Sequence, residues 1–268
     1  MTISASVPQP GTHRSSATFD LTDERVWVTG ASRGLGRAMA LGFAAAGARV
    51  ALTARSADAV RQVADEIEEL GGKPLVLVGS VSDGAAVDAA AATIAEAWGG
   101  LDALVNSAGV SPIFKRAEQV DEDEWRHVLD VNVTGSFLCA REAGKLMLAG
   151  GRGAVVNISS IHGQVGMERM APYAASKGAV DALTRTLALE WAERGVRVNT
   201  LSPGYFETDM TEGLRGHDKW RAHLLGKIPL GRFGVPEELV SAALFLASDA
   251  SGFMTGANLV VDGGWTAA

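Results

Sequence analysis

The sequence predicts an α/β fold in which a doubly wound, parallel β-sheet is flanked by helices on both faces. Short runs rich in β-branched residues alternate with longer runs whose apolar residues recur every three or four positions, a pattern typical of parallel sheets with helical crossovers. A glycine-rich turn joins the first expected strand to the first expected helix. No repeat or linker interrupts the pattern, and 268 residues with 47% hydrophobic content suffice for one core covered on both faces.

The first half of the chain contains four expected strands and three expected helices. The run Arg-Val-Trp-Val-Thr at 25–29 is apolar and β-branched enough for a buried strand. Glycines stop the helices, because Gly47, Gly71 and Gly99 each follow the last apolar position of a periodic run. The expected strands are 25–29, 49–54, 75–78 and 103–105, and the expected helices are 37–46, 60–70 and 82–97.

The second half continues the alternation. A helical run extends from Trp125 to Leu138 and carries one polar residue, Asn132, among apolar neighbours, so its amide needs specific partners inside. Pro172 opens a long helical run, in the position where proline suits a first turn. Strands are expected at 154–158, 196–201 and 257–261, and helices at 125–138, 172–193 and 236–247.

Composition and charge exclude several function classes. The net charge of −7 and the pI near 5.3 argue against a nucleic-acid or anionic-membrane partner, because such a surface needs a basic patch. Cys139 is the only cysteine, which rules out an internal disulfide and fits a reducing compartment. No apolar run is long enough for a membrane span, and the first twenty residues lack the pattern of a secretory signal. We therefore expect a cytoplasmic protein with no membrane partner.

The N-terminal residues differ in composition from the rest. Ser, Thr, Pro and Gly dominate up to Thr18. We expect residues 1–20 to form a flexible extension and residues 21–268 to form one nucleotide-binding domain.

The glycine-rich turn predicts a phosphate-binding loop. A strand, the turn Gly-Ala-Ser-Arg-Gly-Leu-Gly at 30–36 and then a helix form the context of a dinucleotide-binding (Rossmann) fold. The glycines let the backbone approach a pyrophosphate, and the helix N-terminus supplies free N–H groups. The alternative is that the three glycines only form a tight turn and bind no ligand. The predicted cofactor-binding residues of this turn are Gly30, Ser32, Arg33, Gly34, Leu35 and Gly36.

The end of the second strand favours NADP(H) over NAD(H). An NAD-binding unit usually carries Asp or Glu there to bind the ribose 2′-hydroxyl, but this chain has Ala54 followed by Arg55. Arg33 adds a second guanidinium, and two cations without a carboxylate suit a 2′-phosphate. The alternative is that both arginines are solvated surface residues and that Asp58 reaches the ribose.

Two residues in the second half carry the expected chemistry. Tyr173 and Lys177 are four positions apart on a predicted helix, so the phenol and the ammonium share one face. A nearby cation lowers the pKa of a phenol by favouring the phenolate, and Ser160 can donate a hydrogen bond to the oxygen that the tyrosine protonates. A half-buried tyrosine beside a solvated lysine is the alternative.

Taken together, these residues resemble the short-chain dehydrogenase/reductase family over nearly all of the chain after Leu21. The resemblance rests on six pieces in order: Thr29-Gly-Ala-Ser-Arg-Gly-Leu-Gly36, Asn106-Ser-Ala-Gly109, Asn132, Ser160, Tyr173-x-x-x-Lys177 and Pro203-Gly204, with a similar C-terminal part from Pro229 to Gly264.

The resemblance implies a role for each matched residue. Tyr173 would be the general acid/base, Lys177 would lower its pKa and bind the nicotinamide ribose, and Ser160 would hold the substrate oxygen. Asn132 would position a water linked to Lys177. Further cofactor contacts would come from Ser80, Val81, Asn106, Ala108, Gly109, Pro203, Gly204, Phe206 and Thr208. Two departures stand out: Ser80-Val81 replace the family's frequent Asp, and Ser107 replaces its second Asn.

The substrate end is expected in the loop after Ser160 and between Pro203 and Leu230. His162 and Tyr205 are the candidate substrate contacts there, beside Ser160 and Tyr173. Metal binding is not expected, because the spacing of His217 and His223 suits no common site. The stretch 203–208 is similar to gluconate 5-dehydrogenases, and the glycine loop and tail are equally similar to 3-oxoacyl-carrier-protein reductases.

The sequence therefore predicts an NADP(H)-dependent oxidoreductase of a small alcohol or ketone, for which a sugar acid such as gluconate is one candidate substrate. The alternatives are a 3-oxoacyl-carrier-protein reductase and a dinucleotide-sensing protein without turnover. The resemblance also implies a homotetramer, and the apolar stretch 257–265 would suit a subunit contact.

Overall fold

The computed structural model describes residues 19–267. These residues form a seven-stranded sheet in the order β3-β2-β1-β4-β5-β6-β7, and every neighbouring pair of strands is parallel. The predicted doubly wound α/β fold is confirmed. The strands are β1 (Arg25–Thr29), β2 (Arg49–Ala54), β3 (Leu75–Val78), β4 (Ala103–Asn106), β5 (Gly153–Ile158), β6 (Val196–Pro203) and β7 (Asn258–Val261).

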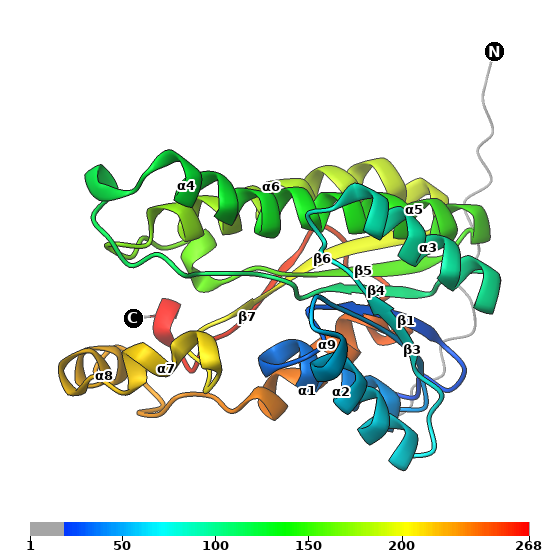
Figure 1. Ribbon diagram of the computed structural model, residues 1–268, viewed down its shortest axis with the longest axis horizontal. Coiled ribbons are helices and arrows are strands. Elements are labelled where there is room, and N and C mark those ends of the chain that lie inside the picture. Colours follow the sequence, from blue (N-terminus) through cyan, green and yellow to red (C-terminus); the bar gives the residue numbers. More distant parts are fainter. Residues whose placement is uncertain (1–18, 268) are drawn as a thin grey trace.

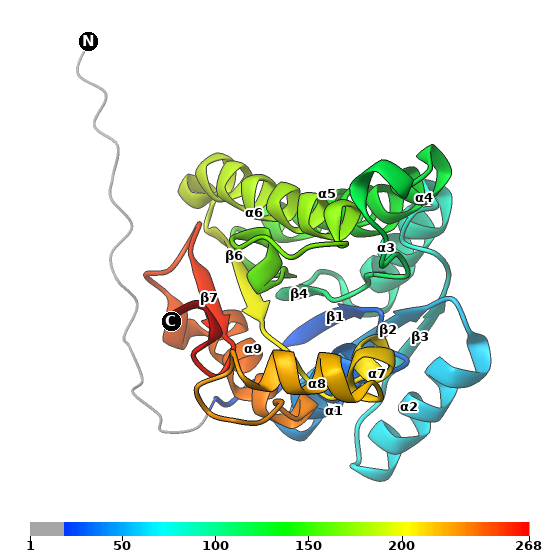
Figure 2. The ribbon, with the colours of Figure 1, turned by 90° about the vertical axis from the view of Figure 1, so that its left-hand side faces the viewer.

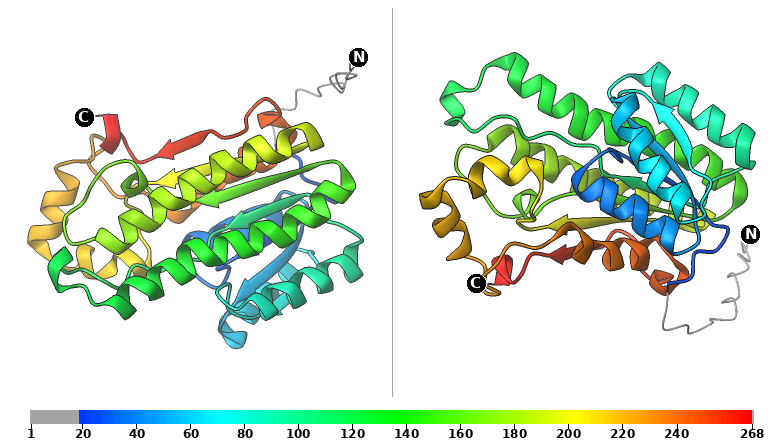
Figure 3. Two further views of the ribbon diagram at one scale, coloured as in Figure 1. Left: turned by 90° about the horizontal axis from the view of Figure 1, so that it is seen from above. Right: turned by 60° about the horizontal axis from the view of Figure 1, so that its bottom comes forward.

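Helices cover both faces of the sheet. One face carries α3, α4, α5 and α6, the other carries α1, α2 and α9, and α7 and α8 lie beyond the sheet at the left of Figure 1. Two further views show the two helical layers in turn (Figure 3). The helices are α1 (Gly34–Ala45), α2 (Ala57–Glu69), α3 (Gly84–Trp98), α4 (Glu122–Leu129), α5 (Gly135–Gly150), α6 (Ala171–Trp191), α7 (Asp209–Arg215), α8 (Asp218–Leu225) and α9 (Val240–Ala247).

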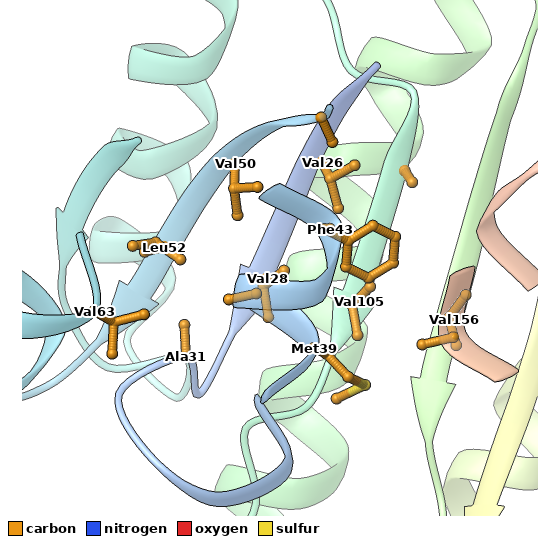
Figure 4. Close-up of a cluster of buried hydrophobic side chains, with 14 of the residues drawn as sticks. Val26, Val28, Ala31, Met39, Phe43, Val50, Leu52, Val63, Val105 and Val156 are labelled. Atoms are coloured by element: carbon orange, nitrogen blue, oxygen red, sulfur yellow. The ribbon is translucent and has the colours of Figure 1, made fainter. Parts of the chain in front are cut away.

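The alternation of side chains along β1 divides the core between the two layers. Val26 and Val28 belong to the cluster under α1, whereas Trp27 belongs to the cluster under α3 and α5, because successive strand residues point to opposite faces. In the first cluster, Met39 and Phe43 of α1 pack against strand residues that include Val26 and Val28 (Figure 4). Both faces of the sheet are therefore buried under helices, which explains why the strand sequences are continuously apolar.

The strand order places a ligand site. The chain leaves β1 toward β2 and β3 on one side, and it returns to β4 on the other side of β1. Ligands of open α/β sheets bind at this reversal, beyond the carboxyl ends of the strands. The loops that follow β1, β4, β5 and β6 all leave from that edge, so the topology brings together the glycine loop, the segment 107–116, the segment 159–170 and the segment 204–235.

One predicted helix is interrupted. The run from Trp125 to Leu138 forms the end of α4, a π-helical turn (Asp130–Thr134) and the start of α5. The wider π turn coincides with the buried Asn132, whose side chain bonds to the segment after β4 rather than to its own helix. The sequence pattern predicted neither this turn nor the short helices α7 and α8.

Three predictions concern features outside this description. Residues 1–18, most of the expected extension at 1–20, lie outside the described residues, so the extension stays a prediction. The homotetramer and the cytoplasmic location also stay predictions. Between residues 19 and 267, no helix is both long and apolar enough to cross a membrane.

Candidate active site

A pocket of about 520 Å³ lies at the carboxyl edge of the sheet. This volume falls in the range of small-molecule and cofactor sites. Figure 2 looks onto this edge, with α7 and α8 on one side of the strand ends and α4 and α6 on the other. The predicted site residues that line the pocket are Gly30, Ser32, Arg33, Gly34, Leu35, Gly36, Arg55, Ser80, Val81, Ala108, Gly109, Ser160, His162, Tyr173, Lys177, Pro203, Gly204, Tyr205, Phe206 and Thr208.

The backbone around the glycine loop leaves no room for a side chain at two of its positions. Gly30 has a φ of 66°, and a Cβ there would lie 2.7 Å from the Cα of Ala108. A Cβ on Gly36 would lie 2.2 Å from the carbonyl oxygen of Gly30, so neither position accepts a side chain. Arg33 precedes α1 without a side-chain cap, which leaves the first N–H groups of that helix available to an anion at the pocket wall. The loop therefore fits a pyrophosphate.

Positive charge lies at the same end of the pocket, because Arg33 belongs to the glycine loop itself. Arg33 and Arg55 both line the pocket beside Ala54, whereas Asp58 lies on α2 and does not. The guanidinium of Arg33 lies 3.4 Å from the carboxylate of Asp209, the first residue of α7, and both side chains are well exposed. This ion pair links the glycine loop to the segment after β6. The two arginines and the small residue at the strand end fit a 2′-phosphate.

Tyr173 and Lys177 come from the first turns of α6, which starts at Ala171. The Nζ of Lys177 is buried and donates a hydrogen bond to the carbonyl of Ile158 at 2.7 Å, and it lies 5.6 Å from the centre of the Tyr173 ring. Burial lowers the pKa of Lys177 to about 8, and the nearby carboxylate of Asp181 opposes that shift. The pKa of Lys177 therefore lies only a little above neutral pH.

The pKa of Tyr173 differs from the sequence-based expectation. Desolvation in the pocket raises it, and the nearby Ser160 hydroxyl opposes this by stabilising the phenolate. The sequence alone predicts that Lys177 lowers this pKa. The difference arises because the ammonium lies over the face of the ring and is bonded to Ile158, whereas the partly buried phenol loses part of its hydration.

The local structure directs the proton of Ser160 toward the pocket. Ser160 follows β5 and caps the short 3₁₀ helix Ile161–Gly163, and its Oγ accepts a hydrogen bond from the backbone N–H of His162 at 3.1 Å. One lone pair is thereby occupied, and the hydroxyl proton remains free to be donated. Since Ser160 lines the same pocket as Tyr173, it can donate to an oxygen that the phenol also contacts.

Asn132 does not line the pocket, but it holds the residues that do. Its Nδ2 donates to the carbonyl of Val110 and to the Oγ of Ser176, both at 3.0 Å, and its Oδ1 accepts from the N–H of Val110 at 2.8 Å. Both donors are occupied, which leaves one lone pair on Oδ1. A Cβ on Gly109 would lie 3.4 Å from that oxygen and 3.6 Å from the Nζ of Lys177, so Asn132 and Lys177 border the same point.

Asn106 was expected to contact the cofactor but lies beneath the pocket. Its Nδ2 donates to the carbonyl of Ser136 and to the Oδ1 of Asn157, at 3.0 and 2.9 Å. The side chain points inward because the last residue of β4 belongs to a buried polar network below the strand ends. The neighbouring N–H groups of Ser107 and Ala108 donate to Thr29, which ties the end of β4 to the end of β1.

The substrate end of the pocket combines aromatic and apolar side chains. His162 and Tyr205 line it as expected, and Met210 and Leu214 of the 203–230 region contribute with Met170. Ile113 and Phe114, in the segment after β4, also line the pocket, and no motif in the sequence marked them. The order of strands could have indicated them, because that segment leaves from the same edge of the sheet.

Phe114 connects the two sides of the pocket mouth. Its ring meets that of Trp220 on α8 edge-on, with centroids 5.1 Å apart, and the guanidinium of Arg169 lies 5.6 Å from the centre of the Phe114 ring. These contacts join the segment after β4 to α8 and to the segment after β5. Between residues 19 and 267 no three His, Cys, Asp or Glu side chains group as metal ligands would.

Comparison with known proteins identifies relatives of two kinds. The family model described as enoyl-(acyl carrier protein) reductase matches residues 30–266. A galactitol 2-dehydrogenase (L-tagatose-forming) of Cereibacter sphaeroides is 46% identical over 89% of this chain and 93% of its own length. A gluconate 5-dehydrogenase of Gluconobacter oxydans is 40% identical over 92% and 96%. A 3-oxoacyl-[acyl-carrier-protein] reductase of Synechocystis is 40% identical over 91% and 97%.

Solved structures share the whole fold. A gluconate 5-dehydrogenase of Burkholderia cenocepacia, in complex with NADP and tartrate, matches with a TM-score of 0.90 and 36% identity, covering 93% of this chain and 98% of that one. A short-chain type dehydrogenase/reductase of Mycobacterium marinum matches with a TM-score of 0.89 and 40% identity over 93% and 98%. The resemblance expected from the sequence, including both kinds of relatives, is confirmed.

Proposed function

The chain belongs to the short-chain dehydrogenase/reductase family of enzymes that act on CH–OH groups, and from this premise we propose that it uses NADP(H) to interconvert a secondary alcohol and a ketone in a small polyhydroxy compound, a sugar alcohol or a sugar acid. The observation that carries the proposal is one pocket with a pyrophosphate cradle and two arginines at one end and Tyr173, Lys177 and Ser160 at the other.

When bound, NADP(H) supplies or accepts the hydride, and the protein handles the proton. In the oxidative direction the Oη of Tyr173, in its phenolate form, would accept the proton that the substrate hydroxyl loses. In the reductive direction Tyr173 returns that proton to the carbonyl oxygen. Ser160 donates a hydrogen bond to the same oxygen, for which its free proton is suited.

Lys177 and Asn132 support the proton transfer. We assign Lys177 to the electrostatic support of the phenolate and to the nicotinamide ribose, because its ammonium lies 5.6 Å from the centre of the Tyr173 ring. We assign the remaining lone pair of Asn132 to a water beside Lys177, while its amide holds Val110 and Ser176 in place. The remaining cofactor contacts belong to the predicted residues that line the pocket, and residues 21–268 form the proposed catalytic domain.

A second candidate function is the reduction of 3-oxoacyl thioesters, which the acyl-carrier-protein reductase among the relatives favours. A substrate panel separates the two. We expect NADPH consumption, followed by absorbance, to be faster with ketoses and keto-sugar acids than with 3-oxoacyl thioesters, and NADP⁺ reduction to be faster with the matching polyols. Turnover of the thioesters alone would make the second candidate the function, and no turnover with any compound would refute both.

The cofactor preference is tested by Arg55→Ala. Loss of a charge-assisted contact to the 2′-phosphate is expected to raise the KM for NADPH about 10- to 100-fold, with a much smaller effect on NADH, which lacks that phosphate. Arg61→Ala is the matched control, because Arg61 is an exposed arginine on α2 that does not line the pocket. Equal effects of Arg55→Ala on both cofactors would contradict the proposed preference.

A further inference from the structure

His162 is held in a single tautomer. The ring lies at the substrate end of the pocket and is buried. Its Nδ1 lies 3.3 Å from the carbonyl oxygen of Val165, and a carbonyl oxygen only accepts, so Nδ1 carries the hydrogen. Burial and the charge of Lys227 lower the pKa of His162, which keeps the ring neutral at neutral pH. The other ring nitrogen, Nε2, therefore has only a lone pair to offer.

This tautomer fixes the direction of the next hydrogen bond. Nε2 of His162 lies 3.0 Å from the Oη of Tyr205, so the tyrosine hydroxyl has to donate its one proton to the histidine. Its oxygen is left as an acceptor only. Burial raises the pKa of Tyr205, so the phenol keeps its proton.

The Tyr205 ring cannot readily turn away from this bond. It is buried at the end of β6, and its centre lies 4.9 Å from that of Trp265, whose ring also meets His162 edge-on. Three aromatic side chains from the segments after β5, β6 and β7 thus support one another. The packing of the ring therefore holds the Oη of Tyr205 in one position.

Tyr205 also lies close to the reacting group. Both tyrosines line the pocket, and the Oη of Tyr205 is bonded to the ring of His162, which follows Ser160 by two residues. Ser160 is linked to the same unit, since its Oγ accepts from the backbone N–H of His162. The pocket therefore offers hydrogen-bond donors, at Ser160 and Tyr173, next to an acceptor at Tyr205.

We propose that the substrate of this enzyme carries a hydroxyl group on a carbon next to the reacting carbon, and that the Oη of Tyr205 selects it by accepting its hydrogen bond. The substrate class is then a vicinal diol in the oxidative direction and an α-hydroxyketone in the reductive direction. This inference rests on the proposed function and narrows its substrate.

The same arrangement disfavours the competing substrates. A 3-oxoacyl thioester has CH₂ groups on both sides of the ketone, so it has no donor for Tyr205, and the desolvated acceptor would remain unpaired. An unpaired buried polar group costs about 1–3 kcal/mol, or about 5- to 150-fold in kcat/KM. Polyols, ketoses and sugar acids with free hydroxyls all supply the donor, and the selection acts on the neighbouring hydroxyl rather than on a carboxylate.

An isosteric pair of ketones provides the test. Hydroxyacetone and butan-2-one differ only in an OH in place of a CH₃ next to the carbonyl. With the wild-type enzyme and NADPH, we expect kcat/KM for hydroxyacetone to exceed that for butan-2-one by about 10- to 100-fold. In Tyr205→Phe this ratio should fall to about threefold or less, because the ring remains and only the acceptor is removed. Trp265→Phe is the control, since it alters the packing of the same ring without removing an acceptor, and its ratio should stay near that of the wild type.

A third ketone tests the direction of the hydrogen bond. Methoxyacetone has an acceptor but no donor at the critical position, so the wild-type enzyme should discriminate against it. In His162→Phe the Tyr205 proton is free to turn toward the pocket, and methoxyacetone should gain relative to hydroxyacetone. A wild-type ratio of hydroxyacetone to butan-2-one near one, or a ratio that Tyr205→Phe leaves unchanged, would overturn the inference while leaving the proposed function intact. Absence of NADPH oxidation with every ketone, including ketoses, would overturn both.

Discussion

Replacing Tyr173 by phenylalanine is expected to lower kcat by about 100- to 10,000-fold, the range that a positioned general acid or base contributes. The substitution removes only the phenol oxygen, so the ring that packs in the first turn of α6 stays, and the affinity for NADPH should change little. The measurements are steady-state turnover with the best substrate of the panel and NADPH binding followed by its fluorescence.

The chain offers a matched control for this result. Tyr205 is the only other tyrosine in the sequence, and it lines the same pocket. Tyr205→Phe also removes a hydroxyl, but we assign that hydroxyl to substrate selection rather than to proton transfer. Its effect should depend on the substrate, whereas that of Tyr173→Phe should be the same for all. Wild-type turnover in the Tyr173 variant would remove the basis of the proposed mechanism.

Replacing Lys177 by methionine should separate activity from stability. Methionine fills similar space without a charge, and kcat should fall about 100-fold or more because the phenolate loses its nearby cation. The free energy of unfolding should not fall in parallel at neutral pH. A buried lysine whose pKa is lowered to about 8 destabilises the folded state while it is protonated. The substitution removes only one hydrogen bond, the one to the carbonyl of Ile158.

The pH dependence of stability follows from the direction of that shift. An unfolded lysine titrates near about 10.4, so at neutral pH both states hold the proton and the folded state bears the full penalty of a buried charge. As the pH rises above about 8, the folded protein releases this proton before the unfolded chain does, and the wild type becomes relatively more stable.

Denaturant unfolding of both proteins measures this effect. The free energy of unfolding of the wild type minus that of Lys177→Met should increase by about 2 kcal/mol between about pH 7 and pH 10. The raised pKa of Tyr173 affects stability only near and above about pH 10, where an unfolded tyrosine titrates. A difference independent of pH would show that Lys177 titrates normally, and a variant with undiminished turnover would show that the ammonium has no part in catalysis.

Much of the candidate site could be predicted because its chemistry is encoded locally. The positions of Tyr173 and Lys177 on one helix face depend only on their spacing and on Pro172 in the first turn. The glycine loop could be predicted for the same reason, because a strand, a tight turn and a helix follow one another without a gap. Five of the seven strands begin at the expected residue, namely β1, β2, β3, β4 and β6.

Contacts between distant segments could not be predicted in this way. Asn132 was expected to have partners, but only the folded chain shows that they are Val110 and Ser176. Asn106 has a suitable sequence context for the cofactor, yet its amide points into the buried network below the strand ends. Sequence spacing predicts the element on which a side chain lies, whereas the packing of neighbouring elements decides which way it points.

The sequence by itself determined the parallel sheet, the phosphate loop, the absence of an acid after β2 and the reacting pair on α6, because each depends on residues within one or two adjacent elements. Only the tertiary structure decided the direction of the two pKa shifts in that pair and the hydrogen bond from Tyr205 to His162, which lie 43 residues apart. The physical reason is that solvent exclusion and hydrogen-bond direction depend on every group that surrounds a side chain, and in this fold those groups come from segments that meet only at the carboxyl edge of the sheet.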